Sequence, residues 1–459
     1  MLLAILISAA FALSLESTND VCAYNVSKTL PDAIKTIADA LASECADPKI
    51  YDITLLDSEH IEQLSINQNV TVFIKGGNGS ATVWKAETPE QQILFIDDGN
   101  ITLENLEFQF IITNETEIHL SPTNNLIFVE GMINKPSITL ISCIFQSIDG
   151  DFKDKIYQLH IHEAQLVQII NSTFNGLGSQ NKSCVSIVSI DDSVEVTIKG
   201  CLFQNALFSE NQEAVIVMMN TFNTTLVIQN NSFINITLSQ ITQEAALSIY
   251  SFVAHKEIIA GNTFTNLYAD KSSSAALFIR DSTQDQSSLK YQFINNTFTN
   301  NTGKVAGAVY LYSTTPSLHY DFTYNTFKLN KNNVTDGLGK DAYFNFTEPH
   351  LDWTVDIIKV ALKDMFNGSK SDAKKGSVYF ETYNDTGVAL SGSVTLSKAK
   401  WYQNVYVIIG IACGAIVLIV ITVLVFICCV VGCRKWKKAF NSTGDERKPL
   451  ISNKQSNSA

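Results

Sequence analysis

A short phrase that ends in phenylalanine returns through most of the chain, and it constrains the fold more than any other feature of the sequence. Seven clear copies end at Phe145, Phe174, Phe203, Phe233, Phe264, Phe298 and Phe327, and a weaker first copy ends at Phe108. The intervals between successive copies are 37, 29, 29, 30, 31, 34 and 29 residues. A period held over seven intervals indicates a solenoid in which each repeat forms one coil.

Each period contains three short β-rich runs separated by Asn, Ser, Gly and Asp, with no helical pattern between them. In the period that ends at Phe233, residues 214–217 and 225–228 are two of the runs, and 229–233 is the phenylalanine phrase. This pattern excludes leucine-rich, ankyrin and TPR solenoids, which need helices or a distinct consensus, and a propeller, which needs four antiparallel strands per blade. A β-sandwich with chance similarity would not keep the phase.

We therefore expect a mainly β ectodomain folded as a right-handed parallel β-helix. Stacking at about 4.8 Å per coil would place each recurring phenylalanine over the next in a continuous inner stack. The recurring asparagines at the bends would form side-chain ladders that satisfy backbone groups.

Two motifs carry a resemblance to known families. An asparagine follows the phenylalanine by two residues, as in Phe233/Asn235, and a Gly-Ala-Val-Tyr phrase stands at 307–310. These resemble the FxxN and GGAI repeats of polymorphic outer-membrane-type proteins. More broadly, residues 30–350 resemble the pectate-lyase-like right-handed β-helix superfamily. That resemblance implies a helical N-terminal cap around residues 30–41 and first coils around residues 64–76.

The start of the chain predicts entry into the secretory pathway. Residues 1–15 are apolar and end with small residues that a signal peptidase could cut, although a buried N-terminal strand is the alternative. Sixteen N-x-S/T sequons follow, which predicts a heavily glycosylated lumenal domain. The sequons begin at Asn25, Asn69, Asn78, Asn100, Asn114, Asn171, Asn181, Asn223, Asn230, Asn235, Asn295, Asn300, Asn333, Asn345, Asn367 and Asn384.

A second apolar run near the C-terminus predicts a membrane span. Residues 405–432 include no charged side chain over 28 positions, and about 20 apolar residues suffice to cross a bilayer. The run is followed by the basic residues Arg434, Lys435, Lys437 and Lys438. The positive-inside rule then places the C-terminus in the cytoplasm, as in a type I protein. Gly410 and Gly414 form a G-x-x-x-G pair that would permit a homodimer.

The predicted order of segments follows from these signals. It is a signal peptide at 1–15, a cap with a helix at 16–50, the β-helix at 51–350, a C-terminal cap and stalk at 351–402, a transmembrane helix at 403–433, and a cytoplasmic tail at 434–459. The protein would therefore lie in the plasma membrane, in endosome–lysosome membranes, or in both, with a lumenal or extracellular N-terminus.

The tail contains one specific short motif, which begins at Asp445. With Glu446, Leu450 and Ile451 it matches the acidic dileucine pattern, and it resembles the tails of lysosomal integral membrane proteins. The resemblance implies that Leu450 and Ile451 enter a pocket of a clathrin adaptor while Glu446 meets a basic patch.

The cysteines fall into two groups. Cys428, Cys429 and Cys433 are predicted at the cytoplasmic membrane face, where they fit either reversible palmitoylation or a simple apolar packing role. On the lumenal side, Cys22 and Cys45 bracket the predicted cap helix and could form a disulfide bond.

The remaining lumenal cysteines are Cys143, Cys184 and Cys201, so this set is odd in number. Cys143 and Cys201 occupy the same repeat position two coils apart, a separation of about 10 Å. Because a disulfide bond needs Cα atoms within about 7 Å, we expect both thiols to be reduced and buried.

The charge of the chain argues against nucleic acid as a partner. The formal net charge is −13, and the tail from Arg434 carries seven basic and two acidic residues, or +5. The rest of the chain is therefore at −18, which would repel phosphate backbones.

No pattern in the sequence predicts catalysis, a metal or a cofactor. The acidic pairs at 97–98, 149–151 and 191–192 are expected in turns at different phases of the repeat, where they would not converge as a lyase or hydrolase requires. His160 and His162, with Glu163 beside them, supply too few ligands for a metal.

We therefore expect a non-catalytic adhesin-like or receptor-like rod that binds extracellular glycans or proteins. A membrane-tethered polysaccharide lyase or hydrolase is one alternative. A structural glycocalyx protein of a lysosomal or phagosomal membrane is another.

The tail motif yields the first testable prediction. Replacing Leu450 and Ile451 by alanine should shift the protein from internal membranes to the plasma membrane, because the adaptor pocket would lose its apolar pair. Surface biotinylation measures the shift, with Ser452→Ala/Asn453→Ala as the control. An unchanged distribution would dismiss the sorting role.

Overall fold

The computed structural model describes residues 21–398, except for 78, 80, 86–91, 110–124, 132–133, 147–155, 177–184, 209–214, 221–223, 240–244, 254–255, 284–289, 315–319, 334–337, 349–352 and 385. The predicted signal peptide, transmembrane helix and tail lie outside the described residues. Within them, no helix is both long enough and apolar enough to span a membrane.

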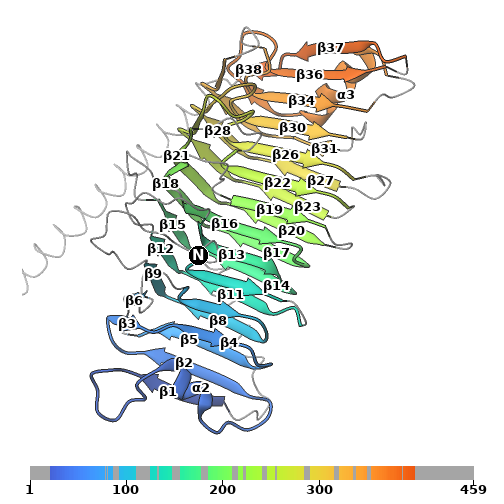
Figure 1. Ribbon diagram of the computed structural model, residues 1–459. Coiled ribbons are helices and arrows are strands. Elements are labelled where there is room, and N and C mark those ends of the chain that lie inside the picture. Colours follow the sequence, from blue (N-terminus) through green and yellow to red (C-terminus); the bar gives the residue numbers. More distant parts are fainter. Residues whose placement is uncertain are drawn as a thin grey trace, which may run out of the picture. The chain divides into compact units, whose positions relative to one another are not determined.

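The described chain winds into about ten turns of a parallel β-helix of the right-handed type, so the predicted mainly β architecture is confirmed (Figure 1). Each complete turn contributes a strand to each of three sheets, which we call A, B and C. Neighbouring strands are parallel throughout, with one antiparallel pair at the C-terminal end of sheet C.

Sheet A opens each turn, and its inner positions alternate with outward ones along every strand. Its strands are β1 (Val21–Val26), β2 (Ile50–Leu55), β5 (Thr71–Gly76), β8 (Asn100–Glu104), β11 (Ser137–Ile141), β14 (Leu166–Ile170), β17 (Glu195–Lys199), β20 (Thr225–Gln229), β23 (Lys256–Ala260), β27 (Lys290–Ile294) and β31 (Tyr320–Asp321).

Sheet B follows after a tight bend and contains the phenylalanine phrase. Its strands are β3 (Glu59–Ile61), β6 (Thr82–Lys85), β9 (Leu106–Gln109), β12 (Ile144–Gln146), β15 (Thr173–Asn175), β18 (Leu202–Phe208), β21 (Ser232–Leu238), β24 (Thr263–Thr265), β28 (Thr297–Thr299), β32 (Thr326–Lys328), β35 (Lys370–Ser371) and β38 (Ser397–Lys398), with β25 (Tyr268–Ala269), β29 (Thr302–Gly303) and β33 (Lys331–Asn332) beside them.

Sheet C closes each turn and contains the first β-rich run of each period, such as the run at 214–217. Its strands are β4 (Leu64–Ile66), β7 (Leu94–Ile96), β10 (Ile127–Glu130), β13 (Ile156–Glu163), β16 (Val185–Asp191), β19 (Val215–Met219), β22 (Leu247–Ser251), β26 (Leu277–Asp281), β30 (Val309–Ser313), β34 (Ala342–Phe346), β36 (Val378–Tyr383) and β37 (Ala389–Val394).

The recurring phenylalanines form one buried stack inside sheet B. From Phe108 to Phe327, each ring pairs in register with its equivalent in the next coil. The ring centroids of neighbours are 4.6 to 5.1 Å apart, and the planes are tilted by 22° at most. The strand spacing fixes this distance, so the aromatic contacts follow from the coil stacking itself. Trp84 extends the stack toward the N-terminus.

A second buried row, two residues before the stack, is an asparagine ladder. The Asn262 side chain donates from Nδ2 to the carbonyl of Ile228 in the preceding coil (2.9 Å), and its Oδ1 accepts the backbone N–H of Asn231 (2.9 Å). Asn296 and Asn325 repeat the pattern. Each side chain thereby satisfies backbone groups at the bend, where the sheet hydrogen bonds end.

Cys143 and Cys201 occupy the ladder position in earlier coils. Both are free and buried, as expected from their two-coil separation. Burial raises the pKa of the Cys143 thiol to about 12 and that of Cys201 to about 11. Thiols with such a high pKa stay protonated and unreactive, so these cysteines fill space in the core.

The N-terminal cap differs in detail from the expectation. The helix predicted around residues 30–41 is shorter, since α2 spans Ile37–Ala42. Ile34 instead forms a bridge with Val26, which holds the chain extended before Thr36 caps the helix. The buried carboxylate of Glu62 accepts the backbone N–H groups of Ile37 and Ala38 (2.8 and 2.9 Å).

Coil stacking continues past residue 350, where the sequence pattern predicted its end. Strands β35, β36 and β38 pair in parallel with the preceding coils. Ser369 takes the ladder position, accepting the N–H of Asn325 (2.9 Å), although no phenylalanine follows it. The helix α3 (Val355–Met365) and the antiparallel hairpin of β36 and β37 then close this end.

The inner stack generates a stability prediction. Phe233→Ala should lower the free energy of unfolding by about 3–5 kcal/mol, because the ring is fully buried between two equivalent rings and leaves a cavity. Thermal and denaturant unfolding of the full chain, followed by circular dichroism, measures the change. Tyr268→Ala, which removes a ring that is 46% exposed, is the matched control, and an equal effect of the two variants would contradict the stack's role.

Candidate functional site

A set of aromatic side chains lies on the outer face of sheet C, outside the main core. In strand β26, Leu277 and Ile279 point into the core, so alternation places Phe278 and Arg280 on the outer face. The same alternation in neighbouring strands continues two parallel rows along the sheet. We call Tyr250, Phe278, Arg280, Tyr310, Tyr312, Tyr343, Asn345, Tyr379 and Glu381 the aromatic strip.

The first row forms the floor of the strip. Phe278, Tyr310, Tyr343 and Tyr379 stack along the coil axis, with ring centroids 5.9, 5.6 and 5.2 Å apart. The first three are buried in a second hydrophobic cluster that also includes Ala306. The floor is therefore packed and rigid, although it belongs to no part of the inner core.

The second row stands partly exposed beside this floor. It runs in register through Tyr250, Arg280, Tyr312, Asn345 and Glu381. The Arg280 guanidinium lies 5.8 Å from the centroid of the Tyr312 ring, within the range of a cation–π contact. Asn345 donates from Nδ2 to the Tyr310 hydroxyl (3.3 Å). Burial and a hydrogen bond to Glu381 raise the pKa of Tyr343.

Arg280 has features that a purely structural role leaves unexplained. It is the only arginine before residue 434. Its Nε is buried and has no hydrogen-bond partner among the described residues. Because the Nε atom has almost no exposed surface, a ligand would meet the partly exposed remainder of the Arg280 side chain. Flat rings next to a guanidinium and an amide suit a saccharide that carries an acidic group.

The acidic residues are arranged differently from the sequence prediction, which placed the pairs at different phases. Asp97 and Asp191 follow Ile96 and Ile190, which occupy equivalent positions in sheet C, and Glu130 pairs with Glu163 in the coils between them. These residues therefore lie near the C-terminal ends of four successive sheet C strands, which we call the acidic column, and Glu130 and Glu163 are direct register partners. The phase was misjudged because the segments between sheets B and C differ in length. The acidic residues at 149–151 lie outside the described residues.

His160 lies beside this column, and His162 is exposed farther along the strand. The Nε2 atom of His160 is 3.6 Å from Asp191 Oδ2, and the ring lies edge-on to Phe128 and Tyr157. Within the described residues, no three His, Cys, Asp or Glu side chains are grouped closely enough to hold a metal ion.

A separate set of carboxyl groups is enclosed inside the last coils. Asp281 accepts hydrogen bonds from the Tyr320 and Thr283 hydroxyls (2.5 and 2.6 Å). Asp341 accepts from the Ser371 hydroxyl and from Asn330 Nδ2. Burial raises the pKa of Asp281, and it raises that of Asp341 to about 6. Both groups are shielded from any ligand, so we assign them a structural role.

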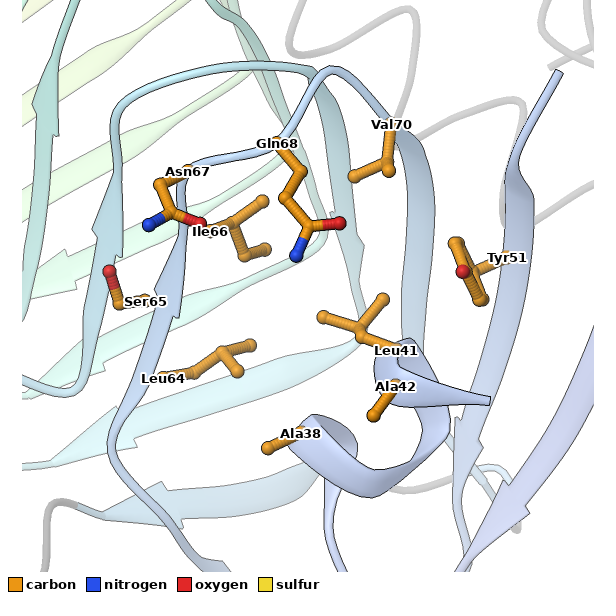
Figure 2. A pocket seen from close by; sticks show the side chains of 10 residues that line it. All are labelled: Ala38, Leu41, Ala42, Tyr51, Leu64, Ser65, Ile66, Asn67, Gln68 and Val70. Carbon is orange, nitrogen blue, oxygen red and sulfur yellow. The ribbon is translucent and has the colours of Figure 1, made fainter. Parts of the chain in front are cut away.

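A small cavity of about 150 Å³ lies at the N-terminal end, between α2 and the turn that joins β4 to β5 (Figure 2). Leu41, Leu64 and Ile66 line it, with the side chains of Asn67 and Gln68 at the same turn. None of its lining residues is charged. It therefore offers a small space of mixed polar and apolar lining, without charged groups for ionic recognition.

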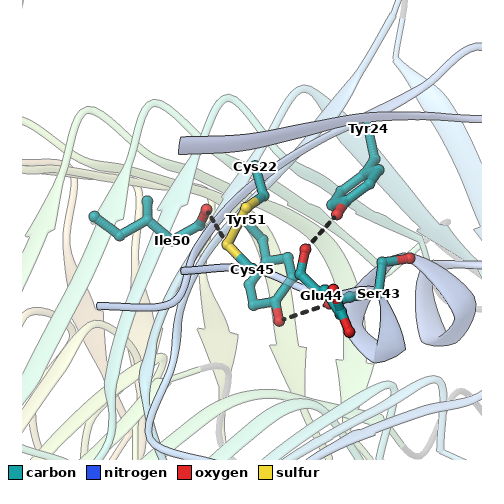
Figure 3. Close-up of a disulfide and its surroundings, with 7 residues drawn as sticks. All are labelled: Cys22, Tyr24, Ser43, Glu44, Cys45, Ile50 and Tyr51. Carbon is teal, nitrogen blue, oxygen red and sulfur yellow. Dashed lines mark hydrogen bonds between the residues drawn. A yellow bond between two sulfur atoms is a disulfide. The ribbon is translucent and has the colours of Figure 1, made fainter. Parts of the chain in front are cut away.

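The cap around this cavity is held by the disulfide bond between Cys22 and Cys45 (Figure 3). The bond joins β1 to the segment after α2. The Tyr24 hydroxyl donates to the carbonyl of Glu44 (3.3 Å), next to the bridge. This is the pairing that the sequence had left as one option for these two cysteines.

The predicted glycosylation sites are mostly at the surface. Asn345 and Asn384 are half-buried, and Asn78, Asn114, Asn181 and Asn223 lie outside the described residues. The exposed sites are Asn25, Asn69, Asn100, Asn171, Asn230, Asn235, Asn295, Asn300, Asn333 and Asn367.

Comparison with protein-family models, with curated proteins and with solved structures gives no match. The fold is consistent with the pectate-lyase-like superfamily, while the repeat subfamily and the tail resemblance rest on the motifs alone. The predicted palmitoylation sites, the Gly410/Gly414 pair and the sorting motif lie outside the described residues.

The buried carboxyl groups generate a pH prediction. Asp341 has a folded-state pKa of about 6, above its ordinary value of 3.8, so the folded chain binds this proton more tightly than the unfolded chain does. Stability from this group should therefore increase as the pH falls through about 6 toward about 4, by about 1 kcal/mol between pH 7 and 5.

Unfolding of the full chain at several pH values measures this dependence. Asp341→Asn keeps the side-chain shape but cannot ionise, so it should flatten the pH profile by that amount. An identical profile in the variant would contradict the assignment.

Proposed function

We propose that the chain is a single-pass type I membrane glycoprotein whose β-helix binds extracellular glycans or proteins without catalysis. The uncharged run at 405–432 with basic residues after it, the apolar start of the chain and the sixteen sequons support the membrane and glycoprotein parts of the proposal. The acidic dileucine motif, with Glu446, Leu450 and Ile451, supports cycling between the surface and endosomes or lysosomes through a clathrin adaptor.

The observation that carries the binding function is the aromatic strip. The fold does not need aromatic residues on an outer sheet face, since the inner core already holds the coils together. A packed floor of tyrosines makes the exposed row rigid, which lowers the entropic cost of binding. The partly exposed guanidinium of Arg280, beside Tyr312, supports an acidic glycan as the ligand, bound through a carboxylate or sulfate group.

One observation favours the alternative of a membrane-tethered polysaccharide lyase or hydrolase. Glu130 and Glu163 of the acidic column are register partners on adjacent strands, whose backbones are about 4.8 Å apart, and retaining glycosidases hold two carboxyl groups roughly 5–5.5 Å apart. His160 and the ring of Phe128 lie next to this column. Release of reducing ends from a polysaccharide by the purified chain would favour this alternative.

The binding proposal is tested on an array of neutral, carboxylated and sulfated glycans with the full-length protein in detergent. We expect binding to acidic glycans, with about a tenfold or greater loss in Tyr312→Ala and in Arg280→Ala, which corresponds to about 1.4 kcal/mol or more. Tyr268→Ala removes an exposed tyrosine from sheet B and is the matched control.

Two outcomes would contradict this assignment. Binding that survives both strip variants would place the ligand elsewhere on the molecule. No binding to any glycan or extracellular protein would favour the structural glycocalyx protein.

A further inference from the structure

The bend between sheets A and B repeats one backbone feature in seven successive coils, from β8 to β27. In these coils, the residue after each sheet A strand adopts the left-handed conformation, with φ between 52° and 69°. In five successive coils this position holds Asn171, Gly200, Asn230, Gly261 and Asn295. Asparagine and glycine are the residues that adopt this conformation most readily. Asparagine and glycine therefore alternate at a position that accepts either.

The three residues of each sequon at this bend have different structural roles. In the coil of Phe233, Asn230 is the exposed left-handed residue, Asn231 is the buried ladder residue, and Ser232 is the first outward residue of β21. The next coil has Gly261 followed by Asn262 and Thr263, so glycine alone prevents a sequon there. The backbone conformation at this position allows either residue, and in the coil of Phe264 the glycine decides that no sugar can attach.

A second row, half-buried at Asn205 and exposed at its other positions, follows the phenylalanine at the other edge of sheet B. It contains Asn205, Asn235, Asn266 and Asn300, all left-handed with φ near 55°. Each Nδ2 donates to the Oδ1 of its neighbour in the preceding coil, at 3.4, 3.3 and 2.9 Å along the row. Of these four, Asn235 and Asn300 begin sequons, and they lie in the same coils as Asn230 and Asn295. The two rows therefore place their sequons in the same alternate coils.

We propose that Asn171, Asn230, Asn235, Asn295 and Asn300 carry N-linked glycans on alternate coils, as a sugar cover along both edges of sheet B. This inference rests on the lumenal location that we propose for the β-helix. Equivalent sites in alternate coils are about 10 Å apart, which separates groups as bulky as glycans. The aromatic strip on sheet C lies outside both rows.

The attachment chemistry fits the geometry of the second row. The oligosaccharide comes from a lipid-linked pyrophosphate donor. A bond forms between Nδ2 and the anomeric carbon, and the bond from that carbon to the phosphate oxygen breaks. The lipid pyrophosphate leaves with that electron pair, and Nδ2 loses one proton, which neutralises charge on the leaving pyrophosphate or passes to solvent. One N–H remains on the modified nitrogen, so Asn235 can keep donating to Asn205.

The glycines have a steric role in this spacing. A Cβ atom on Gly261 would lie 2.4 Å from Oδ1 of Asn230, and one on Gly200 would lie 2.4 Å from Oδ1 of Asn171. Each asparagine side chain therefore extends over the glycine of the next coil. A second asparagine in that coil would compete with it for the same space.

Two sequons are expected to remain unmodified because their asparagines are half-buried and already hydrogen-bonded within the fold. Asn345 is half-buried in the aromatic strip, where its Nδ2 is bonded to Tyr310. Asn384 is half-buried, and its Oδ1 accepts from the Thr386 hydroxyl and the Val388 N–H (2.8 and 2.7 Å).

The test maps the glycans on the full-length chain isolated from eukaryotic cells. Peptide N-glycosidase in heavy-oxygen water converts each modified asparagine to a labelled aspartate, which mass spectrometry locates. We expect all five sites in the modified form and Asn345 and Asn384 unmodified. Gly261→Asn creates a new N-x-T motif in a coil that lacks one, and we expect the same number of glycans per chain, with any gain there matched by a loss at Asn230.

The control for the new motif is Gly261→Asn/Thr263→Ala, which has the same side chain at 261 but no sequon. Its glycan pattern should equal that of the original chain. An additional glycan in Gly261→Asn without loss at Asn230, or unmodified rows in a chain that is glycosylated at Asn25, Asn69 or Asn367, would overturn the alternate-coil inference alone. A chain without any N-glycan would instead overturn the proposed lumenal location.

Discussion

The stacking of equivalent residues from one coil to the next is the constraint on which the rest of the structure depends. Parallel strands hydrogen-bonded in register bring each side chain within about 5 Å of its equivalents above and below. The residue type at each position must therefore pack against the equivalent residues of the neighbouring coils, which together form a row along the axis. Phenylalanine rows make the core, asparagine rows satisfy the bends, and tyrosine rows build the outer face of sheet C.

Two hydrophobic systems result from this rule, and they differ in purpose. The inner system joins all three sheets and explains why the coils stay together. The outer system around Phe278 and Tyr310 contributes to one face only, near the C-terminal end of the described chain. An outer aromatic cluster with a polar, partly exposed row beside it is what a binding surface needs, since rigid rings and fixed polar groups bind with little loss of freedom.

The sequence predicted the features that are locked to the phenylalanine phrase. The β-helix, the positions of Phe145 to Phe327 and the reduced state of Cys143 and Cys201 all follow from the intervals between successive copies of that phrase. The features of sheet C could not be counted in this way, because loops of unequal length separate it from sheet B. The aromatic strip and the column through Asp97 and Asp191 were missed for this reason. Only a register that starts from the sheet C strands themselves, such as 277–281 and 309–313, would have aligned them.

The antiparallel hairpin of β36 and β37 has a consequence for how copies of this chain could assemble. A parallel coil left open at its end would offer a template on which an identical coil could continue, and such ends lead to fibres. Strand β37 runs against that direction and carries Ser391, Gly392 and Ser393 at its centre, which makes it a poor template for further growth. In the membrane location that we propose, crowding of many copies should therefore not drive end-to-end polymerisation through sheet C at this end.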